Sequence, residues 1–147
     1  MSLKCTIIAL IEQFATALIA ASGKPSYVAG RGGANPDLTW LDDQGVPTNK
    51  TGIPFGLNNG LLKELWVGNE LLTQYDLKVY WHDGDEINLT LLTTVTIPNT
   101  ARTKTFNAVD LGIVNVPKGV QIAFQVDNSV GGAPKNTKVH ATITGSP

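Results

Sequence analysis

Few side chains in this sequence are of the kinds that perform catalysis. The chain has two histidines, His82 and His140, and a single cysteine, Cys5. His140 falls in an alternating run on the same face as Lys138 and Thr142, which is typical of a solvated strand position. No G-x-S-x-G or H-E-x-x-H motif is present. Because no nucleophile, base and orienting acid occur together, we predict a non-enzymatic protein with no cofactor and no metal ion.

The densest group of oxygen ligands lies in the segment WHDGDEIN, residues 81–88. Calcium needs several oxygen ligands from one tight loop, and Asp83 and Asp85 flank a glycine that could begin such a loop. The segment is too short to complete a coordination sphere. Asp-Gly between two alternating runs is a strong hairpin signal, so we interpret this segment as a turn.

Three aromatic residues are candidates for binding at a surface: Trp66, Tyr80 and Trp81. Alternation puts Tyr80 and Trp81 on opposite faces of one strand, so one of them lies on an outer face. An exposed aromatic ring can stack on a sugar ring or anchor a protein interface. Packing beneath a neighbouring segment or subunit would explain the same placement.

Residues 1–22 are the only stretch with helical periodicity. Their apolar positions follow the 4-3-4-3 spacing of a heptad seam, at Ile7, Ile11, Phe14, Leu18 and Ala21. Apolar residues also flank the seam on both sides, so the arc is wider than one partner would cover. Gly23 and Pro25 end the helix near residue 22. We predict that the seam forms an oligomer or docking interface.

Other interpretations of this segment stay open. The helix could pack on the chain's own β-domain. A cleaved signal peptide, expected of a secreted adhesin subunit, would have its apolar core interrupted by Glu12 and Gln13. A membrane span needs about 20 apolar residues, more than this segment supplies. Cys5 is interpreted as a small apolar residue of the helix, with a bridge between subunits as the alternative.

The remainder divides into an arm and a β-domain. Residues 23–60 are rich in Gly, Pro and Asn, and we predict an extended arm with one short strand in DLTWL, residues 37–41. Residues 61–147 alternate almost continuously. Clear strands are expected at 75–81, 89–97, 120–126 and 139–143, and weaker ones at 61–67, 103–108 and 113–116. Turn residues separate them, so we predict a mainly β fold, an antiparallel sandwich of jelly-roll or Greek-key type.

Charge excludes two classes of partner. The net charge is −1 and only 16% of residues are charged. Such a chain has no overall electrostatic attraction to nucleic acid or to anionic lipid, so we predict neither as a partner.

The layout of the whole chain resembles the small structural proteins of tailed bacteriophage virions, namely head decoration (cement) proteins and short head or tail fibres. The resemblance rests on the apolar N-terminal helix, the Gly/Pro-rich arm through GIPFGLNNG, and the Thr/Asn-rich sandwich containing VPKGVQIAFQVDN. It implies a homo-oligomer, often a trimer, that is assembled in the host cytoplasm and docks on the major capsid or tail protein of the virion. The lack of a repetitive shaft favours a decoration protein over a fibre. The alternative is a carbohydrate- or receptor-binding sandwich, which predicts binding of a surface glycan by an exposed aromatic residue.

Overall fold

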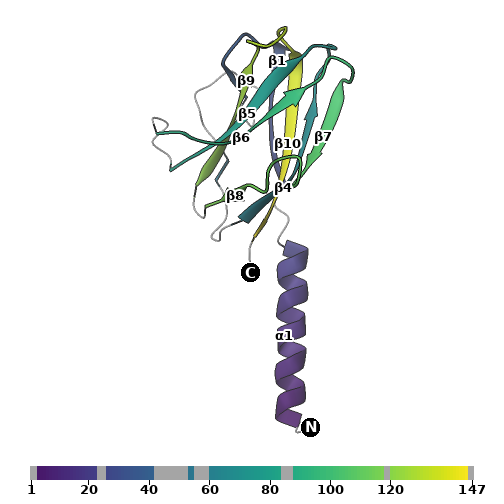
Figure 1. Ribbon diagram of the computed structural model, residues 1–147. Helices are drawn as coiled ribbons and strands as arrows, with labels where there is room; N and C mark the ends of the chain where they lie inside the picture. The colour runs from purple at the N-terminus through teal and green to yellow at the C-terminus, as the bar shows by residue number, and fades with distance from the viewer. Residues whose placement is uncertain are drawn as a thin grey trace.

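The computed structural model describes residues 3–22, 26–41, 53–54, 60–83, 88–117 and 120–145. Two antiparallel sheets pack face to face, and one helix projects from one end of the sandwich (Figure 1). The predicted mainly β sandwich with an N-terminal helix is confirmed.

The first sheet, sheet A, has the strand order β1-β10-β4-β7, with β8 paired to the start of β4. Its strands are β1 (Ser26–Ala34), β4 (Gly60–Gly68), β7 (Thr103–Asn107), β8 (Asn115–Val116) and β10 (Lys135–Gly145). The second sheet, sheet B, has the order β2-β9-β5-β6, with β3 paired to β9. Its strands are β2 (Thr39–Leu41), β3 (Ile53–Pro54), β5 (Tyr75–His82), β6 (Thr90–Ile97) and β9 (Gln121–Asp127). The chain crosses repeatedly between the sheets, which is the wiring of a jelly roll.

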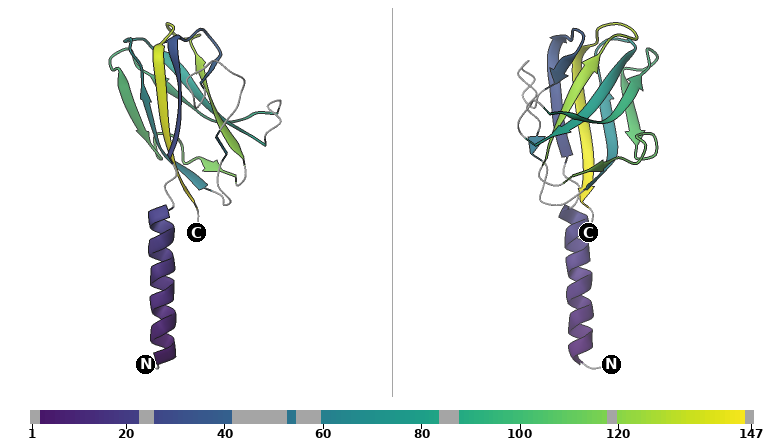
Figure 2. Two further views of the ribbon diagram at one scale, coloured as in Figure 1. Left: turned by 180° about the vertical axis from the view of Figure 1, so that it is seen from behind. Right: turned by 60° about the vertical axis from the view of Figure 1, so that its left-hand side comes forward.

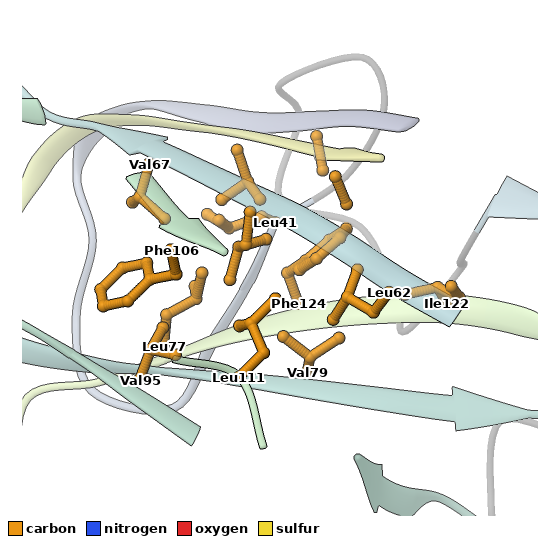
Figure 3. Packing of buried hydrophobic residues seen from close by; sticks show 14 of the residues in the cluster. Leu41, Leu62, Val67, Leu77, Val79, Val95, Phe106, Leu111, Ile122 and Phe124 are labelled. Atoms are coloured by element: carbon orange, nitrogen blue, oxygen red, sulfur yellow. The ribbon is translucent and has the colours of Figure 1, made fainter. Parts of the chain in front are cut away.

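The core lies between the two sheets and follows the alternation of the sequence. Side chains from both sheets meet there, as Figure 3 shows for Leu62 and Val67 of β4 and Leu77 and Val79 of β5. The inward rows of β9 and β10 are also buried, as predicted: Ile122, Phe124, Val126, Val139, Ala141 and Ile143. Each of the seven strands predicted between residues 61 and 147 has a counterpart.

In the strand predicted at 89–97, alternation predicts an inward row of Leu89, Leu91, Val95 and Ile97, but Leu91 points outward. Leu91 of β6 is 50% exposed, while its neighbour Leu92 packs against the core. The cause is a bulge, because Val79 pairs with Thr93 and Tyr80 with Leu91, so Leu92 has no partner across the ladder. An extra residue reverses the alternation on the far side of a bulge. The prediction of an unbroken inward row in this strand was therefore wrong at Leu91.

The predicted arm over residues 23–60 also needs correction. In its described part, β1 pairs with β10 over most of its length, and β2, the short strand predicted in DLTWL, pairs with β9. These residues are strands of the sandwich and do not form a separate extended arm. Glycine-rich β1 gave no periodic signal because Gly30, Gly32 and Gly33 have no side chain to alternate. Residues 23–25, 42–52 and 55–59 of the expected arm lie outside the described part of the chain.

The helix α1 (Leu3–Ser22) ends where it was predicted to end. It stands away from the sandwich in every view, at the end of the molecule where β10 also ends (Figure 2). Its first described turns, residues 3–14, are exposed throughout. For these residues, the alternative in which the helix packs on its own β-domain is ruled out. In the part of the chain that the structure describes, no helix has the length and hydropathy needed to cross a bilayer.

Candidate functional site

Six of the exposed large apolar side chains in the described chain lie on α1. Three seam residues project into solvent, Ile7 at 48%, Ile11 at 62% and Phe14 at 71% exposure. The flanking residues are exposed as well: Leu3, Ile8 and Leu10. The side chains of Leu18 and Ala21, the other two predicted seam residues, lie outside the described part. The structure therefore brings the described seam residues onto one helix, and they lie in the part of it, residues 3–14, that is exposed throughout.

The shape of this surface limits what can cover it. With 3.6 residues per turn, the large apolar side chains from Leu10 round to Ile8 span about 160° of the helix circumference. A single neighbouring helix covers only the narrow a/d seam. A second neighbour is needed to cover the flanks, which favours a bundle of three or more helices.

The free energy available from covering this surface is large. Burial of one Leu, Ile or Phe side chain contributes about 1.5–3 kcal/mol, so the six exposed side chains offer on the order of 10 kcal/mol per helix. Association loses part of this in translational and side-chain entropy. An apolar surface of this size is not expected to stay in contact with water.

Trp66, the first of the three aromatic candidates, lies on the outer face of sheet A. Its indole ring covers Gly68, where an added Cβ would come within 2.5 Å of the indole Cη2. Its neighbours across the sheet are His140 and Thr105. His140 is half-buried on the outer face of β10, as the alternation predicted. This face therefore presents a partly exposed, flat aromatic ring.

Tyr80 lies on the outer face of sheet B. Its ring centroid is 5.4 Å from that of Trp40 on β2, and its hydroxyl donates a 3.4 Å hydrogen bond to Gln125 Oε1. Gln125 Nε2 in turn donates to the carbonyl oxygen of Leu38. Trp40 was not among the predicted site residues, since β2 and β5 come together only through β9.

Trp81 is turned the opposite way and packs against the core. The alternation predicted that Tyr80 and Trp81 would face opposite sides, and this is confirmed. The three aromatic candidates thus lie on two different outer faces and in the core, and the structure does not bring them together into one binding surface.

The end of the sandwich away from α1 is called the distal end. Hydrogen bonds there join the β1–β2, β4–β5 and β9–β10 loops to one another and to neighbouring strands. Asn35 Nδ2 donates to Thr137 Oγ1 at 2.6 Å, and Asn69 Nδ2 donates to the Tyr75 hydroxyl at 3.3 Å. Burial raises the pKa of Tyr75 to about 12, so its hydroxyl is neutral. Backbone bonds add to this, including Gly132 N to Gln74 O at 3.1 Å. These loops display four exposed apolar side chains: Leu38, Leu71, Leu72 and Val130.

Among the described residues, no three His, Cys, Asp or Glu side chains gather where they could share a metal ion. His82 is fully buried at the end of β5. The predicted hairpin after it is confirmed, since β5 and β6 are antiparallel neighbours, although residues 84–87 lie outside the described part. An open groove of about 320 Å³ between β6 and β7 is lined by Thr94, Val95, Thr96, Lys104, Phe106 and Asp110.

No protein-family profile matches the sequence, and no curated protein matches it significantly.

Proposed function

We propose that this chain is a non-enzymatic structural protein of a tailed-phage particle, which oligomerises through α1 and decorates a capsid or tail. The observation that carries the proposal is the exposure of Ile7, Ile11 and Phe14 on a helix that leaves its own sandwich. A helix of this composition needs further copies or a docking partner to cover it. The phage setting, the virion location and the preference for a trimer come from the resemblance of the chain's layout.

The width of the apolar arc supports copies of the same chain as the first partner. Flanking residues Leu10 and Ile8 add contacts on both sides of the seam, which suits a closed bundle of identical helices. Several copies held together would then present several sandwiches to one particle. Multivalent docking of that kind strengthens attachment without any new contact.

The test replaces two seam residues in the full-length chain. Ile11→Asp combined with Phe14→Asp places charge in the bundle interior, where it lacks a partner, and is expected to give a monomer. The matched control, Thr6→Asp combined with Gln13→Asp, adds the same charge on the polar side of the helix and is expected to leave the oligomer intact. Light scattering after size exclusion measures both masses.

Circular dichroism separates loss of assembly from loss of folding, because the sandwich keeps its β-sheet signal in either variant. An unchanged mass for the seam variant would contradict the proposal. A wild-type monomer would also contradict it.

A second candidate, binding of a surface glycan, is favoured by the partly exposed indole of Trp66, which packs against Gly68 on an outer face. Flat aromatic rings of this kind stack on sugar rings. Trp66→Ala should then abolish binding in a glycan screen, while Tyr80→Ala, on the other sheet, should keep it. The jelly-roll fold is used by both capsid and lectin domains, so the fold alone does not separate the two functions.

A further inference from the structure

A turn at the helix end of the sandwich holds two large apolar side chains in solvent. It joins β7 to β8, and Val109 and Ile113 in it are 77% and 63% exposed. Strand β1 leads away from α1, and β7 runs opposite to β1 in the same sheet. The turn that follows β7 therefore lies at the end from which α1 projects (Figure 1).

The turn is held in one conformation by its own hydrogen bonds. Asn107 Oδ1 accepts from the backbone N–H groups of Val109 and Asp110 at 2.8 and 3.0 Å. The Asp110 carboxylate accepts from the Asn107 N–H at 3.0 Å. Ile113 N donates to Ala108 O at 2.8 Å, and Leu111 is buried in the core. The two apolar side chains are thus presented by a fixed scaffold.

The backbone at Ile113 is strained. Its φ is +56°, in the left-handed region, where a β-branched residue is a rare outlier. Glycine or asparagine would adopt this conformation at less cost. The exposed side chain of Ile113 makes little contact within the described chain that could offset the strain. Leu38 carries the same strain at the distal end, so the position of Ile113 at the end from which α1 projects, and not the strain alone, points to a contact outside the monomer.

We propose that Val109 and Ile113 form the contact between neighbouring sandwiches when the chain oligomerises through α1. The inference rests on the proposed function. In a parallel bundle, each helix enters its sandwich at the same end, so neighbouring sandwiches approach most closely there. The turn lies at that end, and its one carboxylate, Asp110, is already bonded within the turn. A second copy of the chain therefore meets the two exposed apolar side chains of the turn.

The first test is Ile113→Gly in the full-length chain, followed by sedimentation over a dilution series. Loss of a buried Ile side chain at each contact is expected to raise the concentration at which the oligomer dissociates by about tenfold or more. The same change relieves the left-handed backbone, so the melting temperature should rise when Ile113→Gly is added to the monomeric seam variant. Val109→Ser, which leaves the backbone unaltered, should give the same weakening of the oligomer.

Leu38→Gly is the matched control. Leu38 also has a left-handed φ of +53° and is 55% exposed, but it lies at the distal end. Its replacement should raise the melting temperature in the same way and leave the dissociation concentration unchanged.

A second readout asks directly whether the turn is covered. A thiol introduced by Val109→Cys, in a Cys5→Ser background, should react with a maleimide more slowly in the oligomer than in the monomeric seam variant. A thiol introduced by Leu72→Cys, in a distal loop, should react at equal rates in both.

The outcomes separate the two proposals. If the seam variant remains an oligomer, the proposed function fails. If the seam variant is a monomer while Ile113→Gly associates like the wild type and the thiol at position 109 reacts equally in both states, only the contact proposed for the turn is overturned.

Discussion

Lys78 and Asp127 form a close ion pair between neighbouring strands of sheet B. The Lys78 Nζ lies 2.5 Å from Asp127 Oδ2. Asp76 stands directly opposite Asp127 in the ladder, so the lysine offsets the repulsion between two adjacent carboxylates. The bond from Lys78, with further bonds from Ser129, holds the pKa of Asp127 well below its usual range. Bonding to Asp127 likewise raises the pKa of Lys78.

The ion pair predicts a specific loss of stability in acid. Because the pKa of Asp127 is lower in the folded chain than in the unfolded chain, its contribution is fully present above the unfolded pKa of about 4 and is lost as the pH falls below it. Asp127→Asn should reduce the free energy of unfolding at pH 7 by about 1 kcal/mol. Urea unfolding from pH 7 to pH 2 should show the difference from the wild type shrinking toward the acid end. A difference that stayed constant with pH would show that ionisation of Asp127 is not its source.

The bulge in β6 predicts opposite results for two neighbouring leucines. Leu92→Ala removes side-chain atoms packed against the core and should reduce the free energy of unfolding by about 2 kcal/mol. Leu91→Ala removes an exposed side chain and should change it by less than about 0.5 kcal/mol. Equal effects in urea unfolding would argue against the bulge.

The close approach of two distal loops predicts that Gly131 tolerates no side chain. An added Cβ would lie 2.1 Å from the backbone oxygen of Gln74, which cannot move without disturbing its loop. Gly131→Ala should lower the free energy of unfolding by about 2 kcal/mol. Gly32→Ala is the matched control, because the nearest atom to its added Cβ is 3.8 Å away, on the Asn136 side chain. Thermal unfolding should show a lower melting temperature for the first variant only.

The buried hydrogen bond between β10 and the β1–β2 loop predicts that removing one hydroxyl lowers the free energy of unfolding. Thr137→Val keeps the shape of the side chain but leaves the Asn35 Nδ2 donor buried without its acceptor. The expected loss is about 1–3 kcal/mol of the free energy of unfolding. Thr105→Val, on the exposed outer face of β7, should be close to neutral. Similar values for the two threonines in denaturant unfolding would show that the buried bond contributes nothing.

Much of the sandwich could be predicted from the sequence because strand alternation is a local property. In residues 75–81 and 120–126, inward-facing and outward-facing side chains alternate from one residue to the next, and turn residues follow or precede each segment. The heptad seam of Ile7, Ile11 and Phe14 is likewise visible in one short stretch. The exposure of this seam was not predictable from the sequence. Whether a helix packs on its own domain depends on the direction in which it leaves that domain, and this direction is set by the tertiary structure.

The tertiary structure decided what depends on partners far apart in the chain. Glycine-rich β1 becomes a strand because β10, more than 100 residues later, supplies its ladder. Leu91 turns outward because the ladder with β5 leaves Leu92 without a partner. Trp66, Tyr80 and Trp81 are close in sequence, yet they lie on the outer face of sheet A, on the outer face of sheet B and against the core. Strand pleating separates Tyr80 from Trp81, and the crossover between the sheets separates both from Trp66. Local patterns determine which residues alternate, whereas pairing between distant strands determines which of them meet.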